Sequence, residues 1–307
     1  MEKLMISRLW FRVALVLCLL AAGVPSLRAA DDEAKAPDKK LHNSSCGNLP
    51  SYNELKAAIE KATADETSGL NNHMWATIVD RDGIVCAVAF SGVNRGAQWP
   101  GSRVISAQKA NTANAFSLDP SSSSSGSGQA AGLALSTANL YSAVQLGGSL
   151  FGLQASNPVV AQLAYGDPYS DNHFAVRPGG LFGTKSDPMV GLRIGGVNVF
   201  GGGLALYAPG HKVVGGLGVS GDTSCADHNI AWRVRNILNL DHMAEGDGLK
   251  AVPGPASLFA GDATHPDNII FDITANAAGG TGNSKSGFGH PSCMNTSGSD
   301  TLPAVRS

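Results

Sequence analysis

Hydrophobic and polar residues follow two different periods in the first half of the chain. Between residues 52 and 62, apolar side chains recur three and four positions apart, which is typical of an amphipathic helix. Ser51 precedes this segment and Glu54 follows it three residues on, so we expect a capping box at the start of the helix. Residues 75–79 and 84–90 are apolar runs joined by an Asp-Gly turn signal, and they predict a β-hairpin.

The second half of the pattern adds two helices and two glycine-rich strands. An alanine-rich segment predicts a helix over residues 103–116, and apolar runs predict strands over 196–207 and 212–219. The next helix is expected to begin at Ser224, which would form a capping box with Asp227. Its expected core residues are Ile230, Val234, Ile237 and Leu238.

The remaining segments are interpreted as additions to one domain over residues 50–244. Residues 31–49 are charged and polar, and we expect a disordered leader there. Residues 119–190 contain a serine- and glycine-rich spacer and are expected to form an insertion with a short helix near 134–144. Residues 245–307 are expected to be an irregular C-terminal extension with one strand-like apolar run.

The N-terminus has the pattern of a secretory signal. Three basic residues precede an apolar run over residues 13–23, and the small residues Ala29 and Ala30 mark a cleavage point. That run has about 11 residues, short of the roughly 20 that a membrane span needs, so cleavage is favoured over an anchor. We therefore expect residues 1–30 to be a signal peptide and the mature protein to be periplasmic or secreted, with no stable membrane span.

Overall charge excludes one class of partner. The formal net charge is −2 and only 15% of residues are charged, so no basic stripe is available for nucleic-acid binding. Hydrophobic residues make up 43% of the chain, which suffices for one sizeable core.

Four cysteines remain after the signal, and an even number in an oxidising compartment predicts disulfides. Three pairings are possible. The pairing we favour joins Cys225 to Cys293 and Cys46 to Cys86, and a pairing of Cys46 with Cys293 would instead tie the two ends together.

A zinc site is the rival interpretation of two of these cysteines. Cys225 and His228, together with His290 and Cys293, could supply a Cys2His2 tetrahedron. Exported thiols are usually oxidised, and neither half has the two-cysteine knuckle of a structural zinc site, so we favour the disulfide. No other metal is assigned.

The glycines near residue 218 admit two interpretations. Gly216, Gly218 and Gly221 satisfy the G-x-G-x-x-G dinucleotide pattern. That fingerprint needs a βαβ unit with an acidic residue at the end of a second parallel strand. Asp241 has roughly the right spacing, but no hydrophobic strand precedes it. We therefore expect these glycines, with Gly203, to allow close approach of a helix or ligand to strand backbone.

The wider context resembles the GlcG/HbpS-like family, known for haem-binding proteins and for a domain appended to some corrinoid adenosyltransferases. Residues 195–235 resemble the family's two glycine-rich strands and following helix, and residues 80–90 and 107–116 resemble its hairpin and its "KA.TA..F" helix. The pieces cover residues 50–118 and 190–244. The resemblance implies an α/β fold of the α+β type, with an antiparallel sheet flanked by helices. It also implies non-covalent binding of haem or a related tetrapyrrole, and a homo-oligomer.

Candidate pocket residues follow from the same motifs. Lys109 and Thr112 share a helix face, and the resemblance directs that face toward the glycine-rich strands. The alternative is a solvated Lys109 and a Thr112 that bonds its own helix. Asp227 is expected to act first as a cap and second as a pocket residue, and His228 is a candidate iron ligand. Spacing singles out no axial ligand among the other histidines: His42, His73, His173, His211, His242, His265 and His290.

Enzymatic chemistry has weaker support. The chain lacks C-x-x-C-H, which excludes covalent c-type haem. Ser220 lies in a near miss of G-x-S-x-G, but His228 and Asp227 are adjacent on one helix and point in different directions, so a triad is disfavoured; His173 remains open as a base. Three functions stay open: a haem-binding protein in haem handling or redox sensing, an enzyme acting on haem or another small metabolite, and a disulfide-stapled interaction module.

Overall fold

The computed structural model describes residues 46–119, 132–165, 181–243, 264–274, 276–279, 282–295, 298 and 301–307. Every described residue belongs to the compact unit His42–Ser307. The expected signal peptide, most of the expected leader, the serine-rich spacer and His173 lie outside the described residues. None of the helices in the described part combines the length and apolar composition needed to cross a bilayer.

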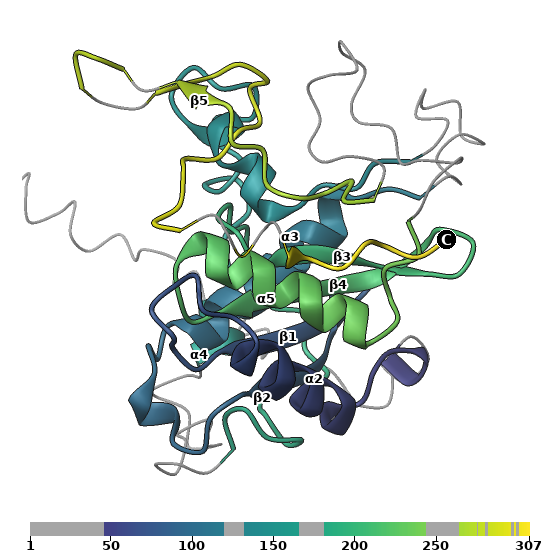
Figure 1. Ribbon diagram of the computed structural model, residues 1–307. Helices are drawn as coiled ribbons and strands as arrows, with labels where there is room; N and C mark the ends of the chain where they lie inside the picture. Colours follow the sequence, from purple (N-terminus) through teal and green to yellow (C-terminus); the bar gives the residue numbers. More distant parts are fainter. Residues whose placement is uncertain are drawn as a thin grey trace, which may run out of the picture. The chain divides into compact units, whose positions relative to one another are not determined.

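A four-stranded antiparallel sheet in the order β2-β1-β4-β3 forms the centre of the domain (Figure 1). The strands are β1 (Trp75–Asp80), β2 (Val85–Phe90), β3 (Gly203–Ala208) and β4 (Lys212–Ser220). The predicted hairpin of β1 and β2 is confirmed, with Trp75 opposite Phe90 and a turn in which Gly83 adopts a φ of 79°. The expected antiparallel sheet flanked by helices is also confirmed, and β4 is antiparallel to both of its neighbours, so no Rossmann βαβ unit forms here.

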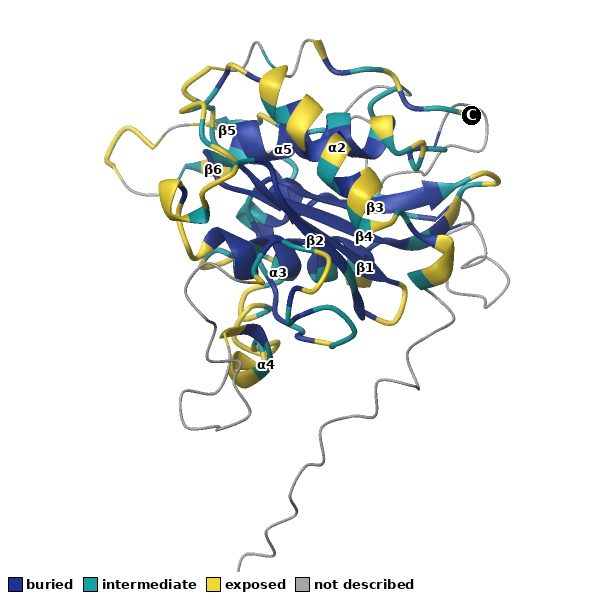
Figure 2. Cartoon of the chain, turned by 90° about the horizontal axis from the view of Figure 1, so that it is seen from below, coloured by how far each residue is buried: buried dark blue, intermediate teal, exposed yellow. Residues whose placement is uncertain are grey.

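Helices cover both faces of the sheet (Figure 2). On one face lie α2 (Tyr52–Ala64) and α5 (Ser224–Ile237), and on the other lies α3 (Ser102–Phe116). The predicted capping box starts α2: Glu54 N donates to Ser51 Oγ, and Ser51 N donates to the Glu54 carboxylate over 2.7 Å. The periodic apolar face of α2 is fully buried against the sheet, as its pattern predicts.

Glycines let α3 lie directly on the backbone of β4. A Cβ atom on Gly218 would be 1.9 Å from the carbonyl oxygen of Ser106, and one on Gly216 would be 2.2 Å from that of Ala110. The residue between them, Leu217, points to the opposite face and joins the core under α2 and α5. Strand β4 therefore carries no side chains at Gly216 and Gly218 on one face and apolar side chains on the other. Helix α3, and not a ligand, covers the face without side chains.

The start of α5 differs from the expectation. The helix begins at Ser224, but its N-cap is Thr223, whose hydroxyl accepts from Ala226 N. The expected Ser224–Asp227 capping box is wrong, because the Asp227 carboxylate turns back to bond the backbone that precedes the helix. Ile237 was expected in the core and is 40% exposed, since it ends the helix, whereas Ile230 and Val234 are buried and Leu238 packs partly against the core.

Several predicted elements are shorter than their apolar patterns. The strand predicted over 196–207 begins only at Gly203, because Gly196 and Gly202 adopt positive φ angles that break the extended chain. In place of a helix near 134–144 there are two 3-10 turns, η5 (Thr137–Leu140) and η6 (Ser142–Val144). The other short elements are η2 (Cys46–Asn48), η3 (Arg95–Ala97), α4 (Ala161–Tyr165), β5 (Ile273–Thr274) and β6 (Asn283–Ser284). The last two form a separate two-stranded sheet.

Replacement of Gly218 by valine tests the contact between α3 and β4. The new side chain would collide with the α3 backbone, so Gly218→Val should lower the free energy of unfolding by about 3 kcal/mol. Urea denaturation would measure the change, with Gly47→Val as the control because a Cβ atom there meets nothing within 4 Å. Equal stability of the two variants would contradict the packing described.

Candidate functional site

Lys109 carries a cation into the interior of the domain. The residue is fully buried on α3, and its Nζ lies 2.6 Å from Asp227 Oδ2. Nζ also donates to the carbonyl oxygen of Val219 over 3.0 Å and lies 3.9 Å from the centre of the Phe200 ring. These partners replace the water that the ammonium loses on burial. The structure thus brings Lys109 and Asp227 together, as a fully buried ion pair.

Asp227 uses its second oxygen to fix the turn between β4 and α5. Its Oδ1 accepts from Gly221 N over 3.1 Å and from Asp222 N over 2.8 Å. Burial raises the pKa of Asp227 to about 7 and lowers the pKa of Lys109. The contact between the two groups opposes both shifts, because each charge favours the ionised form of the other. The pair therefore links α3, β4 and α5 at one point.

The hydroxyl of Thr112 forms hydrogen bonds to the backbone of its own helix and to the segment before β3. Its Oγ1 donates to the carbonyl oxygen of Gln108 over 2.7 Å and accepts from Asn198 N over 3.0 Å. The preceding residue on the same helix, Asn111, donates from Nδ2 to the carbonyl oxygen of Gly196 over 2.8 Å. Thr112 therefore bonds its own helix, which was the alternative interpretation, and also anchors the segment that leads into β3.

His228 is a fully buried imidazole on the first turns of α5. Neither ring nitrogen makes a hydrogen bond among the described residues, and the ring centre lies 6.1 Å from that of Trp232. Burial lowers the pKa of His228 to about 3, against the opposing influence of Asp267. His228 is therefore a neutral ring.

Ser220 ends β4 opposite Trp75 and is also buried. Because neither nitrogen of His228 is hydrogen-bonded, the Ser220–His228 contact that a hydrolase triad requires is absent among the described residues. At Gly221, the next residue, the backbone lies so close to that of His73 that a Cβ atom would be 2.4 Å from the His73 carbonyl oxygen. At Gly203 a Cβ atom would be 2.7 Å from the carbonyl oxygen of Lys109.

An open cavity of about 430 Å³ lies beside the start of α3, away from the residues that the sequence motifs suggested. It is lined by Trp75, Asn94, Arg95, Gly96, Pro100, Arg103 and Phe182. The guanidinium carbons of Arg103 and Arg95 lie 3.8 Å and 4.9 Å from the centre of the Phe182 ring. Arg103 Nε donates to Asp187 over 2.8 Å, whereas Arg95 makes no ion pair among the described residues. Arg95 thus keeps donors for an anion.

His73 is connected to the wall of this cavity through two aromatic contacts, although it does not line the cavity itself. The residue is exposed, and its Nδ1 lies 3.3 Å from Ser91 Oγ. Its ring lies 5.8 Å from that of Phe90, which in turn lies 4.8 Å from the ring of Trp75 at the cavity wall. Spacing alone could not single out this histidine, because the contacts that place it come from two strands and a loop.

A buried ion pair and a hydrogen bond attach the C-terminal extension to α5. Arg235 and Asp267 are fully buried and form two hydrogen bonds of 2.6 and 2.7 Å. Trp232 Nε1 donates to the carbonyl oxygen of Pro303 over 2.8 Å. The sequence does not predict these contacts, because the extension shows no periodic pattern that would direct it onto α5.

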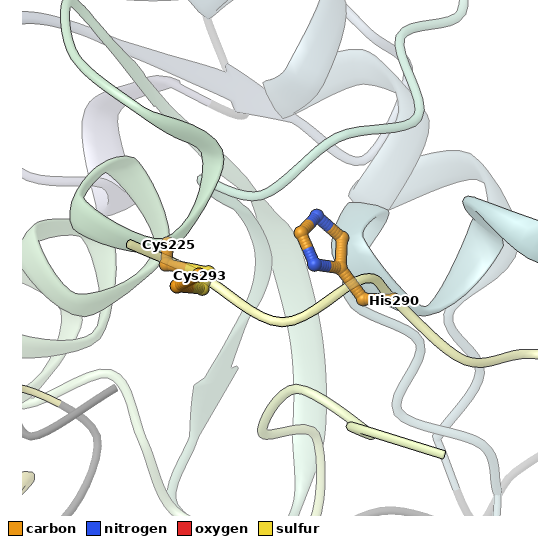
Figure 3. Close-up of side chains that lie close together, drawn as sticks. All are labelled: Cys225, His290 and Cys293. Atoms are coloured by element: carbon orange, nitrogen blue, oxygen red, sulfur yellow. A yellow bond between two sulfur atoms is a disulfide. The ribbon is translucent and has the colours of Figure 1, made fainter. Parts of the chain in front are cut away.

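Both disulfides have the favoured pairing. Cys46 is bonded to Cys86 with a Cα–Cα distance of 5.3 Å, and Cys225 to Cys293 with 6.1 Å. The first joins the segment before α2 to β2, and the second joins the first turn of α5 to the extension. His290 lies beside the second disulfide (Figure 3). In this oxidised state the two sulfurs are bonded to each other and not available as the thiolates of a zinc site.

Comparison with known proteins identifies one family and several solved structures that are similar to this chain. The family model described as "Haem degrading protein HbpS-like" matches residues 52–235. No curated protein matches the chain. The crystal structure of the PduOC:heme complex is 21% identical, with a TM-score of 0.38, over 62% of this chain and 94% of that chain. The Klebsiella pneumoniae protein ORFY, of the DUF336 family model, is 22% identical with a TM-score of 0.36, over 61% of this chain and 86% of that chain.

Removal of the buried cation tests the role of the Lys109–Asp227 pair. Lys109→Met would leave a buried carboxylate without a counterion, so the free energy of unfolding should fall by about 3 to 5 kcal/mol near neutral pH. The loss relative to the wild-type protein should grow as the pH rises through about 7, because Asp227 has a pKa of about 7 beside Lys109 and a still higher pKa once the cation is removed, so that the carboxyl ionises in the folded wild-type protein but not in the folded variant.

Urea denaturation at pH 5 and pH 8 measures both effects. Adding Asp227→Asn to Lys109→Met should remove the pH dependence and restore part of the stability, because no buried charge remains. Lys61→Met is the control, since Lys61 forms only an exposed pair with Asp65. A Lys109→Met variant as stable as this control would show that the pair is dispensable.

Proposed function

We propose that this chain, which belongs to the HbpS-like haem degrading protein family, is an exported protein that binds haem or a related tetrapyrrole without covalent attachment. The observation that carries the proposal is the family match over residues 52–235. The matched segment contains all four strands of the main sheet, α2, α3 and α5 up to Arg235. The match therefore concerns the whole packed domain rather than one motif.

The open cavity beside α3 is the site that best fits such a ligand. Its volume of about 430 Å³ lies in the range of small-molecule pockets. Phe182 supplies an aromatic surface for a planar ring, and Arg95 offers a charge-assisted hydrogen bond to a propionate. Val93 and Trp99 of the same loop are exposed, at 105% and 50%, so apolar surface extends beyond the cavity. A ring larger than the cavity would cover them.

This placement gives the motif residues a structural role. Lys109, Thr112 and Asp227 satisfy one another or the backbone inside the domain, so they hold the sheet and α3 in register beneath the cavity. His73 is the axial ligand we propose, because it is exposed and its Nδ1 is engaged by Ser91, so that Nε2 is the nitrogen left for an iron. His228 is enclosed, and a haem iron there would require α5 to separate from its cover.

Haem degradation is the second candidate function, and the description of the matching family favours it over other enzyme classes. A role in haem handling or redox sensing is compatible with binding alone. Homo-oligomer formation stays a prediction.

Titration of the apo-protein with hemin tests the binding site. We expect a Soret band whose intensity saturates at a fixed ratio of hemin to protein. Arg95→Ala should weaken hemin binding by about tenfold, because one charge-assisted hydrogen bond is lost. His73→Ala should shift the Soret maximum, because the iron loses its axial nitrogen. Arg193→Ala is the control, since it removes the same charge from an exposed residue that bonds the Asp82 carbonyl oxygen. Absence of a Soret band would reject haem binding, and equal affinities of the two arginine variants would reject this cavity.

Reductant and oxygen separate the two candidate functions in the same preparation. A Soret band that persists with ascorbate in air indicates a binding protein. Time-dependent loss of the band with a stoichiometric tetrapyrrole product indicates a haem-degrading enzyme, provided that free hemin under the same conditions decays more slowly.

Export is supported by the two disulfides, which persist in oxidising compartments. The full chain expressed in a Gram-negative host should reach the periplasm or medium with a mature N-terminus near residue 30, and denatured protein should show no free thiols. A chain without residues 1–30 should stay in the cytoplasm. Retention of the full chain in the cytoplasm, with four titratable thiols, would contradict export.

A further inference from the structure

Cys225, Cys293 and His290 form a cluster outside the proposed tetrapyrrole site (Figure 3). The two sulfurs and a ring nitrogen of His290 all lie within 4.8 Å of one another. Cys225 comes from the first turn of α5, whereas the other two come from the C-terminal extension. Sulfur and imidazole nitrogen are the ligands that tetrahedral zinc prefers. Three ligand atoms of the right kind thus meet at one place.

The imidazole of His290 is already oriented as a metal ligand. Its Nδ1 lies 2.7 Å from the carbonyl oxygen of Pro291, which can only accept, so Nδ1 carries the hydrogen. Its Nε2 must then accept from the Ser224 hydroxyl, 2.7 Å away. Metal-binding histidines commonly donate their other N–H to a backbone carbonyl in this way. The lone pair of Nε2 therefore faces the residue next to Cys225.

His228 is the candidate for a fourth ligand, although it lies outside the group of atoms within 4.8 Å of one another. It follows Cys225 by three residues on α5 and so lies on the same side of the helix. The side chain is fully buried, and neither of its ring nitrogens is hydrogen-bonded among the described residues. Two thiolates would balance the charge of one divalent ion, and two neutral imidazoles would add none. Such a site would be electrically neutral in a buried environment.

We propose that the Cys225–Cys293 disulfide is the closed form of a zinc-type site that opens on reduction. A dithiol reductant transfers two electrons, the S–S bond breaks to give two thiols, and the dithiol becomes a disulfide. The metal ion then binds Cys225, Cys293 and His290, with His228 or a water molecule as the fourth ligand, and the two thiol protons pass to solvent. Access is from the extension, where Cys293 is half-buried and the neighbouring Met294 is 77% exposed. The site responds to the reducing power around it by exchanging a covalent link for a metal.

Cobalt(II) is the probe for this site, in a mature chain that carries Cys46→Ser and Cys86→Ser. The substitutions are needed because Cys46, Cys86 and Asp80 form a second cluster of possible ligands. After reduction with a phosphine, which does not bind zinc strongly, we expect one equivalent of cobalt with thiolate-to-cobalt charge-transfer absorption. Zinc should abolish the absorption, and the oxidised protein should show none. His290→Ala should weaken cobalt binding by about tenfold or more, whereas His211→Asn should not.

Three results would overturn the proposal. They are no cobalt binding after reduction, cobalt binding without charge-transfer absorption, and equal affinity of the His290→Ala and His211→Asn variants. His228→Ala distinguishes a four-residue site from one completed by water, through a change in the visible cobalt bands. If reduction alone unfolds the chain by circular dichroism, zinc should restore the folded spectrum, because metal binding then drives folding. Failure of zinc to restore it would also reject the site.

Discussion

The buried ion pair between Lys109 and Asp227 joins the two sides of the domain. Lys109 comes from the helix on one face of the sheet, and Asp227 from a helix on the other, with the end of β4 between them. A buried pair is tolerated only when nearly all its hydrogen-bonding groups have partners, and here Val219, Gly221 and Asp222 supply them. The pair therefore fixes how α3, β4 and α5 meet, and the remaining contacts are arranged around that point.

The pair can form because β4 is bare on one face. With glycine at 216 and 218, the backbone of α3 lies against the strand, and the lysine side chain reaches past its end. The same closeness leaves no room for a ligand between helix and sheet. A cavity large enough for a ligand lies instead where the loop after β2 leads into α3, bordered by Arg95 and Phe182. The glycines of β4 therefore exclude a ligand from the space between α3 and the sheet, because the helix backbone fills it.

The C-terminal extension acts as a second cover for α5. A disulfide holds the first turn of the helix, the Arg235–Asp267 pair holds its last turn, and Trp232 bonds Pro303 in between. These links enclose His228 and bring His290 to Cys225. A segment with hardly any regular secondary structure is kept in place because its attachments are covalent or ionic and buried.

Local signals in the sequence determined much of the scaffold. The capping box of α2, the Asp-Gly hairpin, the span of α3 and the glycines under it follow from interactions between residues close in the chain, or from side-chain size alone. The family motifs identified the residues that converge, Lys109 and Asp227, but could not distinguish a ligand pocket from an ion pair closed on itself. The tertiary structure decided that distinction, the departure of Asp227 from its expected cap, and the position of the cavity bordered by Phe182. Each depends on partners far apart in the sequence, and only packing determines which polar groups find each other and which remain open to a ligand.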